Sequence, residues 1–205
     1  MQRIRRERKT AEPRPPVREG LLAAAKKLFA EKGFDGVSVK ELAEATGHNA
    51  ALVNYYFKSK EGLIHEVLQH SLKTMREGTA DIPSSIRSWP ELENWFNAHI
   101  EFQKASGMAR ACLFGTIANE ITETDEATRR HLESIFDLME ERLATFFAEE
   151  KANRRLAADA NERVLANFCI ATVQGAMLLA KVRRDSATAE RIVREALSDL
   201  RYFIT

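Results

Sequence analysis

Apolar residues recur at every third or fourth position along most of this chain, which is the period of a helix that buries one face. Between residues 17 and 32 the stripe comprises Leu21, Leu22, Ala25, Leu28 and Phe29. Two much shorter helical stretches follow, one from Val39 to a turn at Gly47 and one over residues 49–55. Helices this short are unstable alone, so we expect both to pack on the first helix.

A capping box marks the start of the first short helix. Ser38 precedes Glu41 by three residues, so the Ser38 hydroxyl can accept a hydrogen bond from the Glu41 N–H while the Glu41 carboxylate reaches back. Gly47 can take a positive φ without steric cost, which lets the chain turn. Two short helices joined through a glycine and braced by a third are typical of a helix-turn-helix, whose second short helix enters the DNA major groove.

The pattern stays helical after Leu63, without alternating strand patterns of useful length and without an internal repeat. We expect helices over residues 59–78, 89–105, 108–121, 125–150, 159–182 and 187–203. The Pro- and Ser-rich segment 81–88 is the clearest loop. The predicted fold is all-α, with an N-terminal three-helix helix-turn-helix domain, a C-terminal helical bundle and about nine helices in total.

Charge divides the chain into a basic and an acidic part. Residues 1–76 hold 15 Lys and Arg against 9 acidic residues, whereas the remainder holds 16 against 21. Residues 1–16 are basic, Pro-containing and aperiodic, which favours a disordered tail that either follows DNA or only aids solubility. We therefore expect a basic tail (1–16), a DNA-binding domain (17–63) and a helical effector-binding and dimerisation domain (64–205).

Catalysis, metal binding and membrane insertion find little support in the residues. Cys112 and Cys169 lie far apart with no Cys-x-x-Cys spacing, and the five histidines form no His-x-x-x-His site. We expect neither an enzyme nor a cofactor. No apolar run approaches the roughly 18 residues of a membrane span, and the N-terminus lacks the apolar stretch of a signal peptide. These patterns predict a cytoplasmic protein without a membrane partner.

A family resemblance extends the prediction of DNA binding. The DNA-binding domain of TetR-family transcriptional regulators is similar to residues 17–63, which include the run LFAEKGFDGVSVKELAEATGHNAALVNYYFKSKEGL. The shared features, in order, are Phe-x-x-x-Gly-Phe, Ser-x-x-Glu-Leu-Ala, the turn glycine and Tyr-Phe-x-x-Lys-Glu-x-Leu. The chain departs from the commonest family pattern at Asn54, where an aromatic residue is usual, and at Tyr56, where His is frequent.

The resemblance implies that the helix over 49–55 reads DNA. Candidates for base or sugar contact are Asn49, Ala50 and Asn54, since an Asn amide can pair with adenine and an Ala methyl can meet a thymine methyl. The implied phosphate contacts are Lys40, Tyr55, Tyr56 and Lys60. Either tyrosine could equally be a packing residue with a solvated hydroxyl.

A ligand of the bundle would lie in a mostly apolar cavity between helices. The candidates for effector contact are Trp95, His99, Phe102, Cys112, Phe114, Ile117, Phe136 and Phe168. Each could instead be ordinary core, because any bundle shows such stripes.

Residues 109–121, ARACLFGTIANEI, resemble the Gly-Cys-Leu-x-x-x-x-Ala-x-Glu stretch of TetR regulators related to NemR and LmrA, with Ala111 in place of the Gly. In some of those relatives the cysteine senses electrophiles, so the resemblance makes Cys112 a candidate sensor. A sensing thiolate would be favoured by Arg110 or by the helix start. The alternative is a buried, unreactive thiol.

The last two helices look like a dimer-forming pair over about residues 159–203, as the family resemblance implies; the alternative is that their apolar face is the internal core of a monomer. One helix offers Val164, Phe168, Ala171, Gly175, Leu178 and Leu179, and the next offers Ile192, Ala196, Leu200 and Phe203. A two-fold dimer would require a palindromic operator in double-stranded DNA. The expected function is a repressor that a small molecule or an electrophile releases from that operator. The alternative is an architectural DNA-binding protein without an effector.

Overall fold

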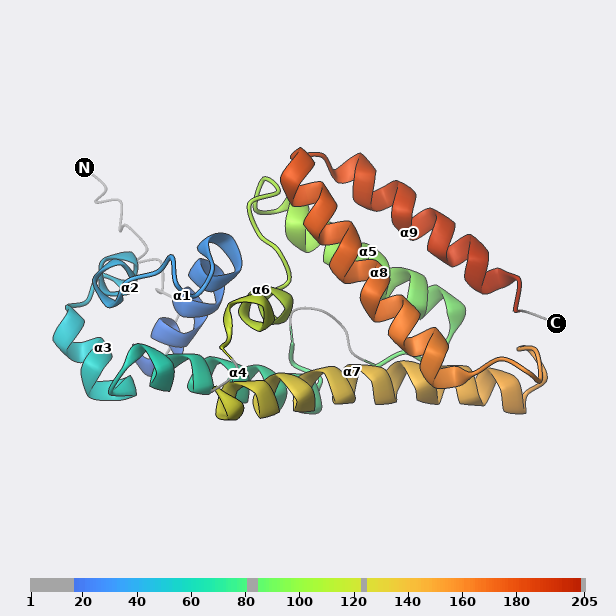
Figure 1. The fold of residues 1–205 in the computed structure, drawn as a ribbon, viewed down its shortest axis with the longest axis horizontal. Helices are drawn as coiled ribbons and strands as arrows, with labels where there is room; N and C mark the ends of the chain where they lie inside the picture. The colour runs from blue at the N-terminus through green and yellow to red at the C-terminus, as the bar shows by residue number, and fades with distance from the viewer. Residues whose placement is uncertain (1–16, 81–84, 123–124, 204–205) are drawn as a thin grey trace, which may run out of the picture.

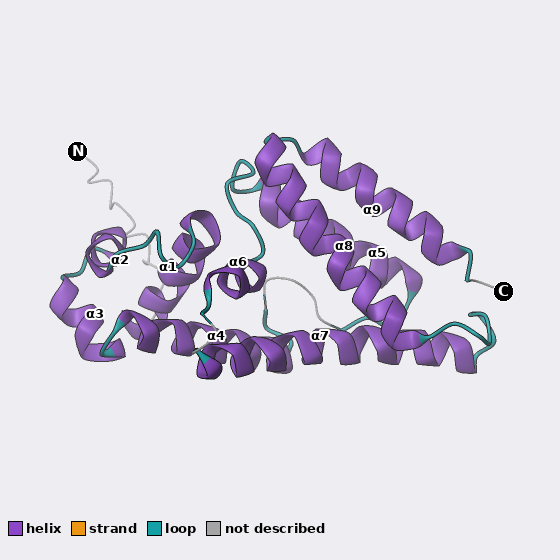
Figure 2. Ribbon diagram, viewed as in Figure 1, coloured by secondary structure: helices purple, strands orange, loops and turns teal. Residues whose placement is uncertain are grey.

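The computed structural model describes residues 17–80, 85–122 and 125–203. These residues form nine helices and no strand, which confirms the predicted all-α fold (Figure 1, Figure 2). The helices are α1 (Val17–Lys32), α2 (Val39–Thr46), α3 (Ala50–Phe57), α4 (Lys60–Glu77), α5 (Trp89–Lys104), α6 (Leu113–Glu120), α7 (Glu126–Ala152), α8 (Glu162–Arg183) and α9 (Ser186–Arg201). The predicted tail 1–16 and part of the predicted loop 81–88 lie outside the described residues.

Most predicted boundaries agree with the structure to within three residues, and α6 is the exception. This helix begins at Leu113, not at residue 108, because Met108 has a φ of 66° and an irregular turn follows α5. Two further starts are set by caps. Asn161 caps α8 by accepting a hydrogen bond from the Val164 N–H at 3.0 Å, and Asn49 caps α3 by accepting one from the Leu52 N–H at 2.9 Å.

The molecule is elongated, with α1 to α3 at one end and the bundle at the other (Figure 1). Helix α4 leaves the helix-turn-helix and packs along α7, while α8 packs between α7 and α9. Helix α6 lies in the middle of the molecule and contacts both α1 and α7. The recognition end and the bundle are therefore joined by two routes, through α4 and through α6.

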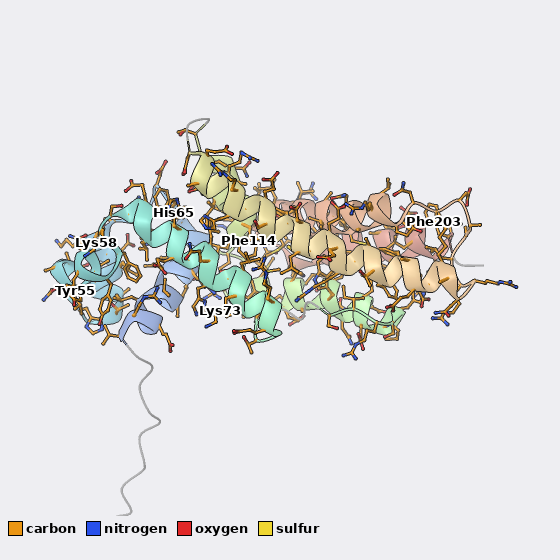
Figure 3. All side chains as sticks on the ribbon, turned by 90° about the horizontal axis from the view of Figure 1, so that it is seen from below. Tyr55, Lys58, His65, Lys73, Phe114 and Phe203 are labelled. Atoms are coloured by element: carbon orange, nitrogen blue, oxygen red, sulfur yellow. The ribbon has the colours of Figure 1, made fainter. Side chains whose placement is uncertain are left out.

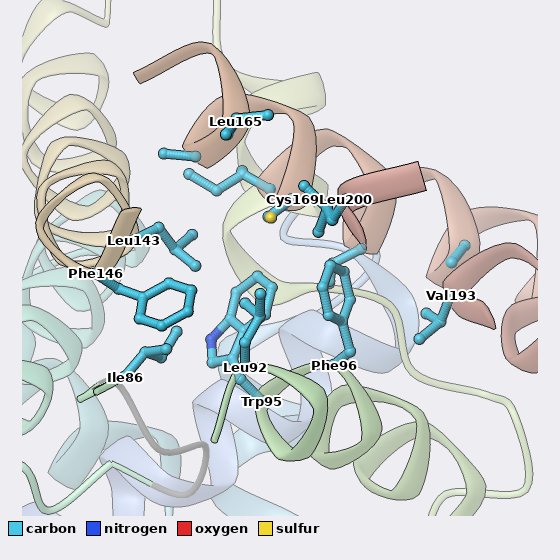
Figure 4. Packing of buried hydrophobic residues seen from close by; sticks show 14 of the residues in the cluster. Ile86, Leu92, Trp95, Phe96, Leu143, Phe146, Leu165, Cys169, Val193 and Leu200 are labelled. Atoms are coloured by element: carbon cyan, nitrogen blue, oxygen red, sulfur yellow. The ribbon is translucent and has the colours of Figure 1, made fainter. Parts of the chain in front are cut away.

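Three hydrophobic clusters hold this arrangement. The first fills the helix-turn-helix and includes Leu21, Phe29, Leu42, Val53 and Phe57. The second joins α4, α6 and α7, and the third fills the bundle. In the bundle cluster Trp95 of α5 faces Leu143 and Phe146 of α7 (Figure 4). Burial of these apolar faces stabilises helices that are too short to persist alone.

Helix α8 corrects the expectation that no segment resembles a membrane span. Among the described residues, Glu162–Arg183 is long enough and apolar enough to cross a bilayer by length and composition alone. One side of α8 packs on α7 and α9, as the core helix of a bundle does. Helix α8 is so apolar because it has both this buried side and an apolar stripe on its outer side.

Candidate DNA-binding surface and ligand cavity

Helix α3 presents a polar and aromatic face at the end of the molecule farthest from the bundle. Val53 and Phe57 are buried and anchor the helix, while Asn54 and Tyr55 are exposed. The Tyr55 side chain is 70 % exposed, and Lys58 lies beside it with Nζ 5.9 Å from the ring centroid (Figure 3). This face is free to meet another molecule.

Asn49 already has a structural role within this helix. Its Oδ1 accepts a hydrogen bond from the Leu52 N–H at 2.9 Å, which caps α3. The cap uses the amide oxygen, and Asn49 as a whole is exposed, so its NH₂ group lies at the surface. Ala50 is half-buried in the first turn. Asn54 has no such role in capping and is exposed.

The two tyrosines lie in different environments. Tyr56 is half-buried and packs on the hydrophobic cluster of the helix-turn-helix, whereas Tyr55 extends into solvent. Their rings meet edge to face with centroids 5.3 Å apart. Tyr56 therefore fits the packing alternative, and its ring supports the position of Tyr55.

The lysines near α3 also differ. Lys60 donates to the Asp35 carbonyl at 3.3 Å and lies 4.4 Å over the Phe34 ring, so it links α4 to the loop before α2. Lys40 is exposed, with Nζ 3.8 Å from a Glu44 carboxylate oxygen. Sequence reasoning did not include Lys58 among the candidate DNA contacts, although the Lys-Ser-Lys run that follows α3 could have indicated it. Lys58 has a φ of 67° and is the C-cap of the helix.

A cavity of about 520 Å³, partly open to solvent, lies where α1 and α4 meet the bundle. Five of the predicted effector contacts line it: Trp95, His99, Phe102, Cys112 and Phe114. Sequence reasoning missed the part of the wall that α1 and α4 contribute, which includes Lys26, Lys27, His70, Thr74 and Met75. No periodicity within one segment could reveal that these side chains converge with residues of α5.

Three predicted effector contacts do not line the cavity. Ile117 is fully buried in the cluster that joins α4, α6 and α7. Phe136 packs against the bundle core. Phe168 points outward on α8 and is 38 % exposed. Each lies on a helical stripe as expected, but these stripes face other partners.

His99 separates the bundle core from the cavity. Its Nδ1–H donates to the Trp95 carbonyl at 2.8 Å, and its ring lies 4.7 Å from the Trp95 ring. Burial lowers the pKa of His99 to about 4, so the imidazole is neutral near pH 7. The bond at Nδ1 leaves Nε2 as the hydrogen-bond acceptor of this ring.

The two cysteines lie in different surroundings. Cys169 is fully buried in the bundle, where burial raises the pKa of its thiol to about 12. Cys112 is half-buried in the cavity wall at the N-cap position of α6, and Gln174 Nε2 donates to its Sγ at 3.1 Å. A Cβ at Gly115 would lie 2.3 Å from the Gln174 Oε1, so the glycine lets Gln174 reach the thiol.

Polar contacts fasten α1 to the bundle around the cavity. Arg110 pairs with Glu31 at 3.2 Å, and the Ala111 N–H donates to the Ala30 carbonyl at 3.0 Å. Below them, the Glu120 carboxylate of α6 accepts a hydrogen bond from the Phe34 N–H. Gly33 permits this approach, because a Cβ there would lie 2.1 Å from a Glu120 oxygen and its φ is 81°.

The outer side of α8 carries an apolar stripe. Val164, Phe168, Ala171, Gly175, Leu178 and Val182 follow one another at spacings of four and three residues. Ala196 and Leu200 do not extend this surface, because both are buried within the same chain. The surface available to a partner is therefore mainly that of α8.

The residues that the structure describes contain no group of three His, Cys, Asp or Glu side chains that could hold a metal ion.

Comparisons with known proteins agree with this architecture. Residues 21–67 match the family model for bacterial regulatory proteins of the tetR family, and residues 88–196 match that of the tetracyclin repressor-like C-terminal domain. The HTH-type transcriptional repressor DhaR of a Mycobacterium species is 27 % identical over 90 % of this chain and 93 % of its own. Both relatives and structural neighbours are regulators and not enzymes.

Solved structures share the fold. A TetR regulatory protein from Rhodobacter sphaeroides has a TM-score of 0.80 at 21 % identity, covering 92 % of this chain and 99 % of its own. A cysteine mutant of the TetR-family regulator CifR, complexed with 26-bp double-strand operator DNA, has a TM-score of 0.74 at 24 % identity, covering 93 % and 100 %. With both of its domains matched by family models, this chain belongs to the TetR family of DNA-binding transcriptional regulators.

Proposed function

We propose that this regulator is a cytoplasmic repressor that binds a palindromic operator as a homodimer and releases it when a small molecule occupies the cavity. The observation that carries the proposal is the position of the cavity, whose wall is shared between α1 and α4 on one side and the bundle on the other. A ligand there contacts the DNA-binding half and the bundle at once. Three relatives, DhaR, AcnR and ComR, are named as transcriptional repressors.

The DNA-binding half is supported by the exposed face of α3. Asn54 and Tyr55 are available for contact with base edges or the backbone, and Lys58 can neutralise a phosphate. In this proposal Asn49 contributes its remaining amide N–H groups, Ala50 meets a thymine methyl, and Lys40, Tyr56 and Lys60 lie along the DNA backbone. The hydrogen bonds of Asn49 and Lys60 within the protein make their contributions the smaller ones.

Release follows from the two routes between the ends of the molecule. A ligand that fits only one spacing of α1 and α4 relative to α5 and α7 favours that spacing, and the distance between the two α3 helices of a dimer changes with it. To shift the ratio of the released state to the operator-binding state from 1:99 to 99:1, the ligand must bind the released state more tightly by about 5.5 kcal/mol. A cavity of about 520 Å³ accommodates a ligand with enough contacts for that.

The first test selects DNA fragments that the full chain binds and sequences them. We expect a palindrome with half-sites about one helical turn or a multiple of it apart. Uniform coverage of unrelated DNA would instead indicate an architectural protein.

Two variants then separate base reading from phosphate binding. Asn54→Ala should weaken binding to the selected operator by about 100-fold and leave random DNA unaffected, because one base pair in each half-site loses its partner. Lys58→Gln should weaken both alike and reduce the salt slope by about 1.8, since one phosphate contact is lost in each subunit of the dimer. Equal losses on operator and random DNA for Asn54→Ala would contradict its assignment as a base reader.

An electrophile could cause release through Cys112, because its Sγ lies in the cavity wall. We expect N-ethylmaleimide to release operator DNA from the wild type and from Cys169→Ser, but not from Cys112→Ser. The buried Cys169 serves as the matched control. If Cys112→Ser responds as the wild type does, the effector acts only by reversible binding.

A further inference from the structure

The cavity has an uneven distribution of charge. Four cationic side chains line it, Lys26, Lys27, Arg110 and Arg142, whereas Glu19 is the one acidic residue among the described lining residues. Arg110 is already paired with Glu31. A wall with this surplus attracts a negatively charged molecule.

Within the described residues, Arg142 of α7 has one guanidinium nitrogen with a partner and one without. Its Nη2 donates to the Met75 carbonyl at 2.7 Å, which helps to cap the C-terminal end of α4. Its Nη1 is buried and has no hydrogen-bond partner among the described residues. The hydrogen bond to α4 accounts for Nη2 but not for Nη1. Burying a guanidinium N–H without a hydrogen-bond acceptor costs free energy.

The neighbouring histidine responds to the same positive surroundings. His70 Nδ1 lies 3.1 Å from Lys26 Nζ. Burial lowers the pKa of His70, and the charge of Lys26 lowers it further. A neutral His70 does not compete with the cations for an anionic ligand.

The rest of the wall is aromatic and apolar. Trp95, His99 and Phe102 reach the cavity from one face of α5, and Met139 and Leu143 reach it from α7. Arg142 of the same helix also lines the cavity, so one wall carries both a cation and apolar surface. The volume of about 520 Å³ lies within the range of roughly 300–1,000 Å³ that is usual for pockets of organic ligands.

We propose that the effector is an amphipathic organic anion, whose carboxylate, sulfonate or similar oxyanion pairs with Arg142 and whose apolar body packs against Trp95 and Phe102. This inference rests on the proposed function, in which the cavity binds the effector. Such an oxyanion can accept charge-assisted hydrogen bonds from the guanidinium of Arg142, which lines the cavity. It would bind next to the end of α4, the helix that leads to the recognition helices.

Two dyes with the same aromatic skeleton test the charge preference. 1-Anilinonaphthalene-8-sulfonate carries a sulfonate, and N-phenyl-1-naphthylamine is its neutral counterpart. Their dissociation constants are measured by fluorescence with the full chain, and each dye is used to displace the other. If each dye displaces the other, the two share a site. If Phe102→Ala also weakens the binding of both dyes, that site is the cavity.

Arg142→Met is the decisive variant, because it keeps an unbranched apolar stem and removes the guanidinium with its charge. We expect it to weaken binding of the sulfonate 10-fold to 100-fold and that of the neutral dye less than threefold. Arg142→Lys should restore much of the sulfonate binding. Arg130→Met is the matched control, because Arg130 lies on the same helix with its side chain 70 % exposed and away from the cavity, and it should bind both dyes as the wild type does.

The outcomes separate this inference from the proposed function. If both dyes bind in the cavity and Arg142→Met weakens them equally or not at all, the anion preference is wrong although the cavity holds ligands. If neither dye binds there, the ligand site itself fails, and both proposals with it. Should Arg142→Met not fold, the wild type still decides: sulfonate binding must weaken with added NaCl while neutral-dye binding does not.

Discussion

His99 stays neutral in a wall that otherwise carries positive charge. Its ring donates to a backbone carbonyl of its own helix and stacks edge to face on Trp95, so protonation would place a charge in an apolar surrounding. The residue thus contributes packing and an acceptor to the cavity, but no charge.

This environment predicts a dependence of stability on pH. The folded pKa of about 4 is below the ordinary value of 6.5, so below pH 6.5 the unfolded chain binds a proton that the folded chain does not. Stability is fully present above pH 6.5 and is lost as the pH falls towards 4. The free energy of unfolding should decrease by about 2 kcal/mol more in the wild type than in His99→Gln between pH 7.5 and pH 5, measured by urea titration. Parallel curves for the two proteins would show that His99 titrates normally.

For single residues, the sequence predicted contacts with neighbours in the chain better than contacts with residues of distant helices. The Ser38 cap is present, with its Oγ accepting from the Glu41 N–H at 3.1 Å, because capping depends on neighbours in the chain. Arg142 and Lys26 could not be assigned to the cavity from sequence, because their surroundings come from helices far away in the chain. Asn49 was predicted to contact DNA, and its bond to Leu52 adds a capping role to that prediction.

At the scale of elements, the helical period predicted where helices lie but not which sides they turn to each other. Residues 105–112 carry apolar side chains that suit a helix, yet the chain turns there and α6 starts late. The turn allows Ala111 to bond to Ala30 of α1, a tertiary contact that outweighs local propensity. Similarly, Val193 and Leu200 lie on a stripe of α9 that faces its own bundle.

The outer stripe of α8 predicts the mode of assembly. Apolar residues at alternating spacings of four and three suit a helix that packs against its two-fold copy. Leu178→Glu places two carboxylates in that contact, so the dissociation constant of the dimer should rise at least about 100-fold. Analytical ultracentrifugation measures this, with Ser198→Glu as the matched control on the exposed side of α9. A Leu178→Glu protein that remains dimeric would exclude the α8 stripe as the interface.

At the scale of the whole molecule, the sequence predicted two functional regions and the structure adds how they are joined. The DNA-binding region could be predicted because its short motifs carry their own chemistry. The cavity could not be outlined, because α1, α4, α5, α6, α7 and α8 all contribute to it. Sequence patterns report which face of one helix is apolar, whereas a cavity is a property of how several helices meet.

The bond from the Phe34 N–H to Glu120 bears on the exchange of domains between regulators. A hybrid that joined α1 to α4 of this chain to the bundle of a relative would lack a hydrogen-bond acceptor at the end of α1 unless that bundle carried an acidic residue in the place of Glu120. The Gly33 that makes room for this carboxylate would then border an empty space. To keep this hydrogen bond, a hybrid must therefore take α6 from the same protein as the helix-turn-helix. The two are not contiguous in the chain, because α4 and α5, with more than 30 residues, lie between them.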